Sequence, residues 1–280
     1  MANVFETFER KHDWLVCVDS DGCAMDTMDC KHFHCFGPCM VTEWQLEPWS
    51  EALLARWNDI NLYSMTRGVN RFKGLAMALT EADAQYTPID GVAALNEWVT
   101  ASPALSNDAL AAAVAAGGHP VLAKALAWSR AVNAAIVRLP EELKVPFAGA
   151  KEGLAAAKSF ADVAIVSSAN RDAVVEEWEK FGLLEHTDIT LAQDCGSKAH
   201  CIEKMLEFGY APDHVLMVGD APGDCDAAEK NGVWYYPILV RREGESWEEL
   251  RTKTLEIFKN GGYAAIQAEK KAEFLKNLGG

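Results

Sequence analysis

The feature that most constrains the fold is a series of short apolar runs, each followed at once by polar or glycine residues. The clearest runs are Trp14–Val18, Val163–Val166 and Val215–Val218. A fourth, over residues 233–239, is rich in aromatic and β-branched residues, and a weaker fifth spans residues 189–192. Runs of this length between turn signals predict buried strands. Strands that are apolar along their whole length are typical of a parallel sheet covered on both faces.

Helix-like stretches separate these runs. They cover residues 150–158, 172–181, 198–208 and 224–231. Because strand and helix alternate from about residue 150 onward, we expect an α/β fold, with a doubly wound, Rossmann-like parallel sheet. The tail, residues 246–275, predicts two further helices split by Gly261 and Gly262.

A long insertion separates the first run from the second, far beyond an ordinary crossover connection. Within it, Ala, Leu and Trp recur with helical spacing, and glycine and proline supply the breaks. These stretches are residues 48–57, 69–79, 92–99 and 120–139. We therefore expect residues 1–25 and 145–280 to form an α/β core domain, and residues 26–144 to form an inserted α-helical domain.

The charge balance argues against two classes of partner. With 26 basic and 41 acidic residues the net charge is −15, which repels nucleic acid and anionic membrane surfaces. The N-terminal segment lacks the basic stretch and apolar run of a signal peptide, and no apolar run is long enough to span a bilayer. We expect a cytoplasmic protein that is a monomer or a weak homo-oligomer. An anionic substrate would need a local metal ion or local basic residues.

Eight cysteines raise the question of disulfides or zinc. Several lie inside regular elements of a chain without a secretion signal, so we expect reduced thiols. One cluster contains zinc-ligand residue types, but its spacing matches no paired CxxC or HxxxH pattern, so buried or entrance-lining side chains are the favoured interpretation. The cluster consists of Cys30, His32, His34, Cys35 and Cys39.

Polar residues follow the predicted strands where a ligand of such a sheet would bind. In an open parallel sheet this place lies beyond the carboxyl ends of the strands. Taken singly, each residue has a structural explanation, as a turn residue, a helix cap or a solvated lysine. Together they predict one site at one edge of the sheet. The residues are Asp19, Asp21, Ser167, Ser168, Lys198, Asp220 and Asp224.

The crowding of carboxylates predicts a cation at this edge. Four carboxylates at one spot repel each other unless a cation lies among them, and Mg²⁺ prefers oxygen ligands and bridges to phosphate. Asp19 and Asp220 are the expected direct ligands, with Asp224 direct or through water. Lys198 would restrain Asp19 and a bound phosphate, while the Ser167 hydroxyl and nearby N–H groups would bind phosphoryl oxygens.

The spacing of Asp19 and Asp21 suits two chemical roles. One carboxylate can attack phosphorus and form an aspartyl-phosphate, and the other can protonate the leaving alcohol and then deprotonate water. Gly22 would let the chain turn sharply and bring Asp21 beside its neighbour.

At these residues the chain resembles the haloacid dehalogenase-like superfamily of phosphohydrolases. The matching segments are VCVDSDGC, VAIVSS, GSKAHCIEKML and LMVGDAPGDCDAAEKNG. The resemblance implies a doubly wound core with a helical cap inserted after the first motif. It also implies roles for individual residues: Asp19 as nucleophile, Asp21 as acid/base, Ser167 with Ser168 and Lys198 as phosphate ligands, Asp220 and Asp224 as metal ligands, and the carbonyl of Asp21 as a further ligand.

The chain departs from the family pattern in two places. Cys23 stands where the family usually has Thr or Val, and residues 25–38 match no segment of known role. The basic residues Arg67, Arg71 and Lys73 of the insertion are candidates for contacting an anionic substrate, although a solvated helix face explains them equally well.

Several functions remain open at this point. The favoured one is a Mg²⁺-dependent phosphatase acting on a small phosphorylated metabolite, and Asp21 argues against the dehalogenase branch, which lacks the second aspartate of the first motif. A phosphomutase resembling β-phosphoglucomutase would pass the phosphate to a sugar hydroxyl instead of water. A phosphonatase would need an insertion lysine such as Lys31 or Lys73. A catalytically silent binding protein would have no need of the complete residue set.

Overall fold

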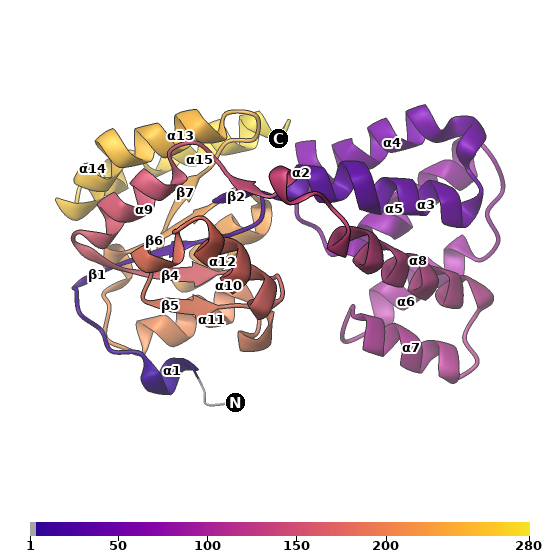
Figure 1. Ribbon diagram of the computed structural model, residues 1–280, viewed down its shortest axis with the longest axis horizontal. Helices are drawn as coiled ribbons and strands as arrows, with labels where there is room; N and C mark the ends of the chain where they lie inside the picture. The colour runs from indigo at the N-terminus through magenta and orange to yellow at the C-terminus, as the bar shows by residue number, and fades with distance from the viewer. Residues whose placement is uncertain (1–3) are drawn as a thin grey trace. The chain divides into compact units, whose positions relative to one another are not determined.

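The computed structural model describes residues 4–280, which divide into two compact units (Figure 1). The α/β unit contains the chain up to Met28 and the segment Glu142–Gly280, and the helical unit is Asp29–Glu141. The sequence placed the corresponding boundaries after residue 25 and after residue 144, a few residues from those of the structure.

The α/β unit contains a five-stranded parallel sheet in the order β5-β4-β1-β6-β7, with helices on both sides (Figure 1). Its strands are β1 Trp14–Val18, β4 Ala161–Val166, β5 Ile189–Leu191, β6 Val215–Gly219 and β7 Trp234–Pro237. The predicted doubly wound α/β fold is confirmed. β1 is central because its apolar side chains are buried on both faces, between β4 and β6.

The helices of this unit fall close to their predicted positions, except for the first, over residues 4–7, which was not predicted. They are α1 Val4–Thr7, α9 Ala150–Lys158, α10 Arg171–Lys180, α11 Lys198–Leu206, α12 Pro222–Asn231, α13 Glu243–Glu249, α14 Leu255–Lys259 and α15 Gln267–Asn277, with the π-helical turn η8 Leu250–Thr254 between α13 and α14. The predicted break at Gly261 and Gly262 separates α14 from α15. Within residues 4–280, no helix is both long and apolar enough to cross a bilayer.

The helical unit contains no strand among its residues and encloses its own apolar core. Its elements are α2 Met28–Lys31 (which begins one residue before the unit), η1 His32–Phe36, α3 Gly37–Trp44, α4 Ser50–Asn58, η3 Asp59–Tyr63, α5 Arg71–Gln85, α6 Val92–Ala101, α7 Asn107–Ala115 and α8 Pro120–Val137. Trp57 and Trp128 are fully buried at its centre, with ring centroids 6.0 Å apart. Aromatic side chains of this size each bury a large apolar area.

Two further features were not predicted: a short ribbon and a helical stretch through the Cys/His cluster. Strands β2 (Met25–Asp26) and β3 (Val145–Pro146) form an antiparallel ribbon of two residues each, within the α/β unit. The Cys/His cluster lies in an unbroken helical stretch, residues 28–44. In this stretch the His32 Nδ1 accepts a hydrogen bond of 3.0 Å from the Trp57 indole. The eight cysteines of the chain are all free thiols.

Candidate active site

Asp19 and Asp220 lie next to each other because they follow neighbouring parallel strands. Val18 of β1 is in register with Val218 of β6, and the Asp19 N–H donates to the Val218 carbonyl at 3.0 Å. Both aspartates are buried, with 5% and 1% of their surface exposed. The sheet thus holds two carboxylates at its carboxyl edge, where a doubly wound sheet binds ligands.

Asp224 joins them from the first turn of α12. Its Oδ2 accepts hydrogen bonds from the main-chain N–H groups of Asp220 at 3.2 Å and Ala221 at 3.1 Å. This helix start is a favourable place for a carboxylate, because its N–H groups have no partners within the helix. Gly219 allows the approach, since a Cβ there would lie 2.4 Å from the Asp224 carboxyl group.

Lys198 connects two of the three carboxylates. It is the first residue of α11, whose N-cap Ser197 accepts a hydrogen bond from the His200 N–H at 3.2 Å. The Lys198 Nζ lies 2.7 Å from Asp19 Oδ2 and 2.6 Å from Asp224 Oδ1. The lysine therefore fixes one oxygen of Asp19, while the Ser20 N–H binds the other at 2.7 Å.

The electrostatics of the cluster favour a charged lysine and raise the pKa of Asp19. Burial raises the pKa of Asp19 well above its ordinary value; Lys198 opposes that increase, and the carboxylates of Asp224 and Asp220 add to it. Burial alone would lower the pKa of Lys198, but Asp19 and Asp224 outweigh burial and raise it. Lys198 is therefore an ammonium group whose charge opposes the repulsion between the carboxylates.

The residues present fit a divalent cation. One oxygen from each of Asp19, Asp220 and Asp224 lies within 4.8 Å of the others, and among residues 4–280 this is the group of acidic, His or Cys residues close enough to share an ion. Three carboxylates face one ammonium group, so ionised side chains leave an excess of negative charge. Buried oxygen ligands of this kind suit Mg²⁺. The Cys/His cluster of the helical unit forms no such group.

Asp21 lies at the start of a tight turn over residues 22–24. Gly22 adopts a φ of 82°, a backbone conformation that glycine allows without strain, and so turns the chain as predicted. The Thr27 hydroxyl donates a short hydrogen bond to Asp21 Oδ1. The hydrogen bond from Thr27, which follows β2, thus orients the Asp21 carboxyl group.

Ser167 and Ser168 differ in their surroundings. Ser167 is buried one residue beyond β4, next to β1 at the same edge of the sheet, and its Oγ accepts from the Ala169 N–H at 3.1 Å. Ser168 is exposed. The phosphate-binding roles expected of both remain predictions.

The three basic residues expected to contact substrate belong to the helical unit and have different surroundings. Arg67 is 3% exposed, and its Nη1 donates to the Leu62 carbonyl at 2.8 Å. Arg71 lies 5.0 Å over the Phe36 ring and donates to Asn133 Oδ1 at 2.7 Å. Lys73 is exposed. Two of the three are thus committed to contacts inside the helical unit.

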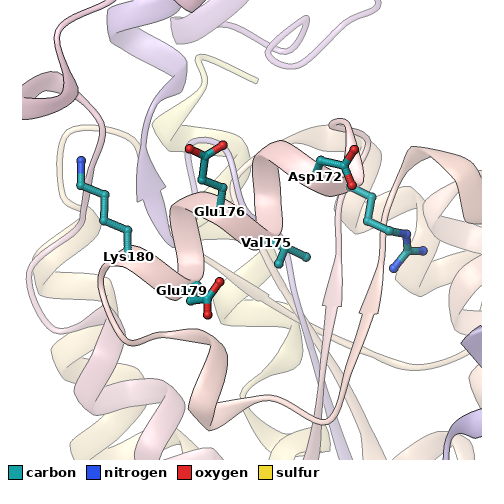
Figure 2. A pocket seen from close by; sticks show the side chains of 6 residues that line it. Asp172, Val175, Glu176, Glu179 and Lys180 are labelled. Carbon is teal, nitrogen blue, oxygen red and sulfur yellow. The ribbon is translucent and has the colours of Figure 1, made fainter.

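A surface hollow of about 570 Å³ lies along α10 (Figure 2). Its lining side chains, Arg171, Asp172, Val175, Glu176, Glu179 and Lys180, all belong to α10. Their mixed charges give it no preference for an anion, and none of the candidate site residues lines it.

Four site residues were missed by sequence reasoning: Ser20, Thr27, Trp178 and Trp247. Thr27 binds Asp21, and the two indoles donate to the turn that carries the aspartates. The tryptophans read as ordinary core residues, and their partners lie 158 and 224 positions away in the chain. No local pattern could have pointed to them.

Comparison with known proteins supports the family resemblance. Residues 118–236 match the model of a family described as haloacid dehalogenase-like hydrolase. A search among curated proteins found no match.

Solved structures with a similar fold have low sequence identity. One, from Lactobacillus delbrueckii subsp. bulgaricus and provisionally assigned as a phosphoglycolate phosphatase, is 11% identical, with a TM-score of 0.51 over 81% of this chain and 86% of that one. Another, from Thermotoga maritima and provisionally assigned as a β-phosphoglucomutase, is 16% identical, with a TM-score of 0.49 over 88% and 97% of the two chains. A defluorinating L-2-haloacid dehalogenase, Rha0230, is 14% identical, with a TM-score of 0.41 over 85% and 87%. Residues 118–236 are thus similar in sequence to the haloacid dehalogenase-like hydrolases, and the chain shares the fold of a solved structure provisionally assigned as a phosphatase.

Proposed function

We propose that this hydrolase removes phosphate from a small phosphorylated metabolite, with Asp19 as a covalent nucleophile and Mg²⁺ held by Asp19, Asp220 and Asp224. The observation that carries the proposal is the contact between Lys198 and Asp19 beside two further buried carboxylates. An anionic nucleophile can attack a phosphoryl group only when cations neutralise the negative charge of that group, and Lys198 with a bound metal ion would provide those cations.

In the first step an oxygen of Asp19 forms a bond to phosphorus as the bond to the leaving alcohol oxygen breaks. Asp21, protonated beforehand, gives its proton to that oxygen, and the alcohol departs. A water molecule then attacks the phosphorus of the aspartyl-phosphate and gives a proton to Asp21. The bond to Asp19 breaks, and inorganic phosphate and the starting carboxylate are regenerated.

Other residues stabilise this sequence without changing their bonds. Lys198 opposes the increase in the pKa of Asp19 that burial causes, and it offers a positive charge to the phosphoryl oxygens. Bound Mg²⁺ would supply Lewis-acid neutralisation of the transferring group. The Ser167 hydroxyl is the candidate hydrogen-bond donor from β4. Asp21 favours phosphate over a haloacid as substrate, because ester cleavage needs an acid for the leaving alcohol.

The proposal is tested by assaying the purified protein against phosphorylated metabolites with and without Mg²⁺, beside Asp19→Asn. We expect Mg²⁺-dependent phosphate release that falls by at least about 10³-fold in the variant, because an amide cannot form the intermediate. Asn at this position keeps the size of the side chain, so the variant's thermal unfolding serves as the control. Activity of the variant close to that of the wild type, or a wild type that binds Mg²⁺ and releases no phosphate, would contradict the proposal.

A further inference from the structure

Two buried tryptophans from different helices donate hydrogen bonds to the turn that carries Asp19 and Asp21. The Nε1 of Trp178, on α10, donates to Ser20 Oγ at 2.8 Å. The Nε1 of Trp247, on α13, donates to the Cys23 carbonyl at 2.9 Å. Both side chains are buried, with 0% and 1% exposed. We call Trp178 and Trp247 the indole pair.

The turn between these two contacts is held together through one carbonyl group. The Ser20 oxygen accepts hydrogen bonds from the N–H groups of Cys23, Ala24 and Met25 at 3.2, 3.0 and 2.9 Å. Residues 20, 23, 24 and 25 are all fully buried. Trp178 therefore binds the side chain at the start of the turn, while Trp247 binds the main chain at its end.

The indole pair is itself fixed by packing. A Cβ on Gly153 of α9 would lie 2.5 Å from the Trp247 ring, so helix and ring are in close contact. On α10 the residues around the surface hollow point outward (Figure 2), while Trp178 belongs to the apolar core on the opposite face. An indole has one donor and a rigid ring, so a packed ring fixes the direction of its N–H.

We propose that Trp178 and Trp247 are positioning residues, whose N–H groups hold the turn of residues 19–23 so that Asp19 faces Lys198 and Asp21 stands ready beside it. This inference rests on the proposed function, because it takes the two aspartates as nucleophile and acid/base. Small displacements matter at such a site: a shift of about 1 Å can cost on the order of 100-fold in rate.

The kinetic test compares Trp178→Phe and Trp247→Phe with Trp234→Phe. Phenylalanine keeps an aromatic ring and removes the donor. Trp234 is the matched control, because its indole donates to the Asp213 carbonyl at 2.9 Å, away from the site and before β6. We expect kcat to fall about 10- to 100-fold in the first two variants with KM unchanged, and no change in the control.

Ser20→Ala removes the acceptor of Trp178 and keeps both rings. It should reproduce the effect of Trp178→Phe, and the double variant should be no worse than either single one, because both remove the same hydrogen bond. If Trp178→Phe does not fold, Ser20→Ala decides the question for that contact. Equal kcat in Ser20→Ala and the wild type would overturn it.

Amide hydrogen exchange tests the positioning without any activity. The N–H groups of residues 23–25 should exchange faster in the Trp178→Phe and Trp247→Phe variants and at wild-type rates in Trp234→Phe. Unchanged exchange, or faster exchange with unchanged kcat, would overturn the inference. If the wild type releases no phosphate, only the proposed function is contradicted. The exchange rates would still show whether the indole pair orders the turn.

Discussion

The two units use buried polar side chains in opposite ways. In the α/β unit Asp19, Asp220 and Asp224 are gathered with a single lysine, so that like charges stay close. In the helical unit Arg67 and Asn61 each donate to a main-chain carbonyl. Crowded charge costs stability and is kept where chemistry needs it, whereas scattered donors bonded to neutral oxygens serve packing. The contrast separates the unit that holds the candidate site from the unit that is built mainly around its core.

The largest expected effect on stability tests the core of the helical unit. Trp128→Ala should lower the free energy of unfolding by about 3–5 kcal/mol, because it leaves a cavity where the ring packs against Trp57 and Phe72. Denaturant unfolding measures the loss. Val137→Ala, on the same helix and 81% exposed, is the control and should change stability by less than about 0.5 kcal/mol.

The same variant sharpens the comparison if hydrogen exchange is followed in both units. We expect lost protection in α5 and α8 and unchanged protection in β1 and β6, because the two units have separate cores. Equal loss of protection in the sheet would contradict the independence of the cores.

Two glycines offer a matched pair, one in each unit. A Cβ on Gly219 would lie 2.4 Å from the Asp224 carboxyl group, and one on Gly74 would lie 2.4 Å from Asn61 Oδ1. Both alanine variants should lose about 1–3 kcal/mol of stability from overpacking, partly offset at Gly74 by a gain in helix propensity. Calorimetry with Mg²⁺ should separate them, with weaker binding in Gly219→Ala alone. Equal loss of Mg²⁺ affinity in Gly74→Ala would break the comparison.

The basic residues of the helical unit test whether cations there serve packing. Arg71→Met should cost about 1–3 kcal/mol, because Asn133 and Ser129 lose their donor and Phe36 loses the guanidinium above its ring. Lys73→Met, at an exposed position, should stay within about 0.5 kcal/mol. Thermal unfolding of both variants measures this difference; a larger loss for Lys73→Met would contradict it.

The smallest effect concerns Asp188, a paired carboxylate of the α/β unit that is not one of the candidate site residues. Burial raises the pKa of Asp188, but Lys158, the Val163 N–H and Lys11 outweigh burial and hold it below its ordinary value of 3.8. A lowered pKa means that the folded state binds the proton less readily than the unfolded state. The stabilisation from Asp188 is therefore complete at a pH above its pKa in the unfolded state. It disappears as the pH falls through its pKa in the folded state.

The Asp188→Asn variant should have a free energy of unfolding at neutral pH that is lower than that of the wild type by about 1 kcal/mol or less. As the pH falls, the free energy of unfolding should decrease less in the variant than in the wild type. Denaturant unfolding over a pH series measures both. Parallel curves for the two proteins would show that Asp188 carries none of the acid sensitivity.

How far the sequence predicted the structure depends on the range of the interactions involved. The strand Trp14–Val18 and the helix Ala150–Lys158 were predicted to the residue, because continuous apolar runs and helical spacing are local signals. The clustering of Asp19, Lys198, Asp220 and Asp224 was expected from strand ends alone.

The failures have physical causes of their own. The ribbon β2–β3 is two residues long on each side, too short for any periodicity, and it pairs segments on either side of the insertion. The helix through the Cys/His cluster contains aromatic, Cys and His residues of ordinary helix propensity, so its pattern was hidden. Arg67 was expected to contact an anionic substrate or to lie on a solvated helix face, but its side chain is buried and donates to the Leu62 carbonyl, a burial that no local pattern signals.

The β2–β3 ribbon has a consequence for how the chain tolerates rearrangement. Met25 faces Pro146 and Asp26 faces Val145, so the two ends of the inserted segment leave and re-enter the α/β unit as paired neighbours. The entropy of closing such a long loop grows only slowly with its length. The inserted segment should therefore be removable by protein design. A short hairpin turn that joins Asp26 to Val145 would close the same ribbon and leave β1, β4 and β6 in register.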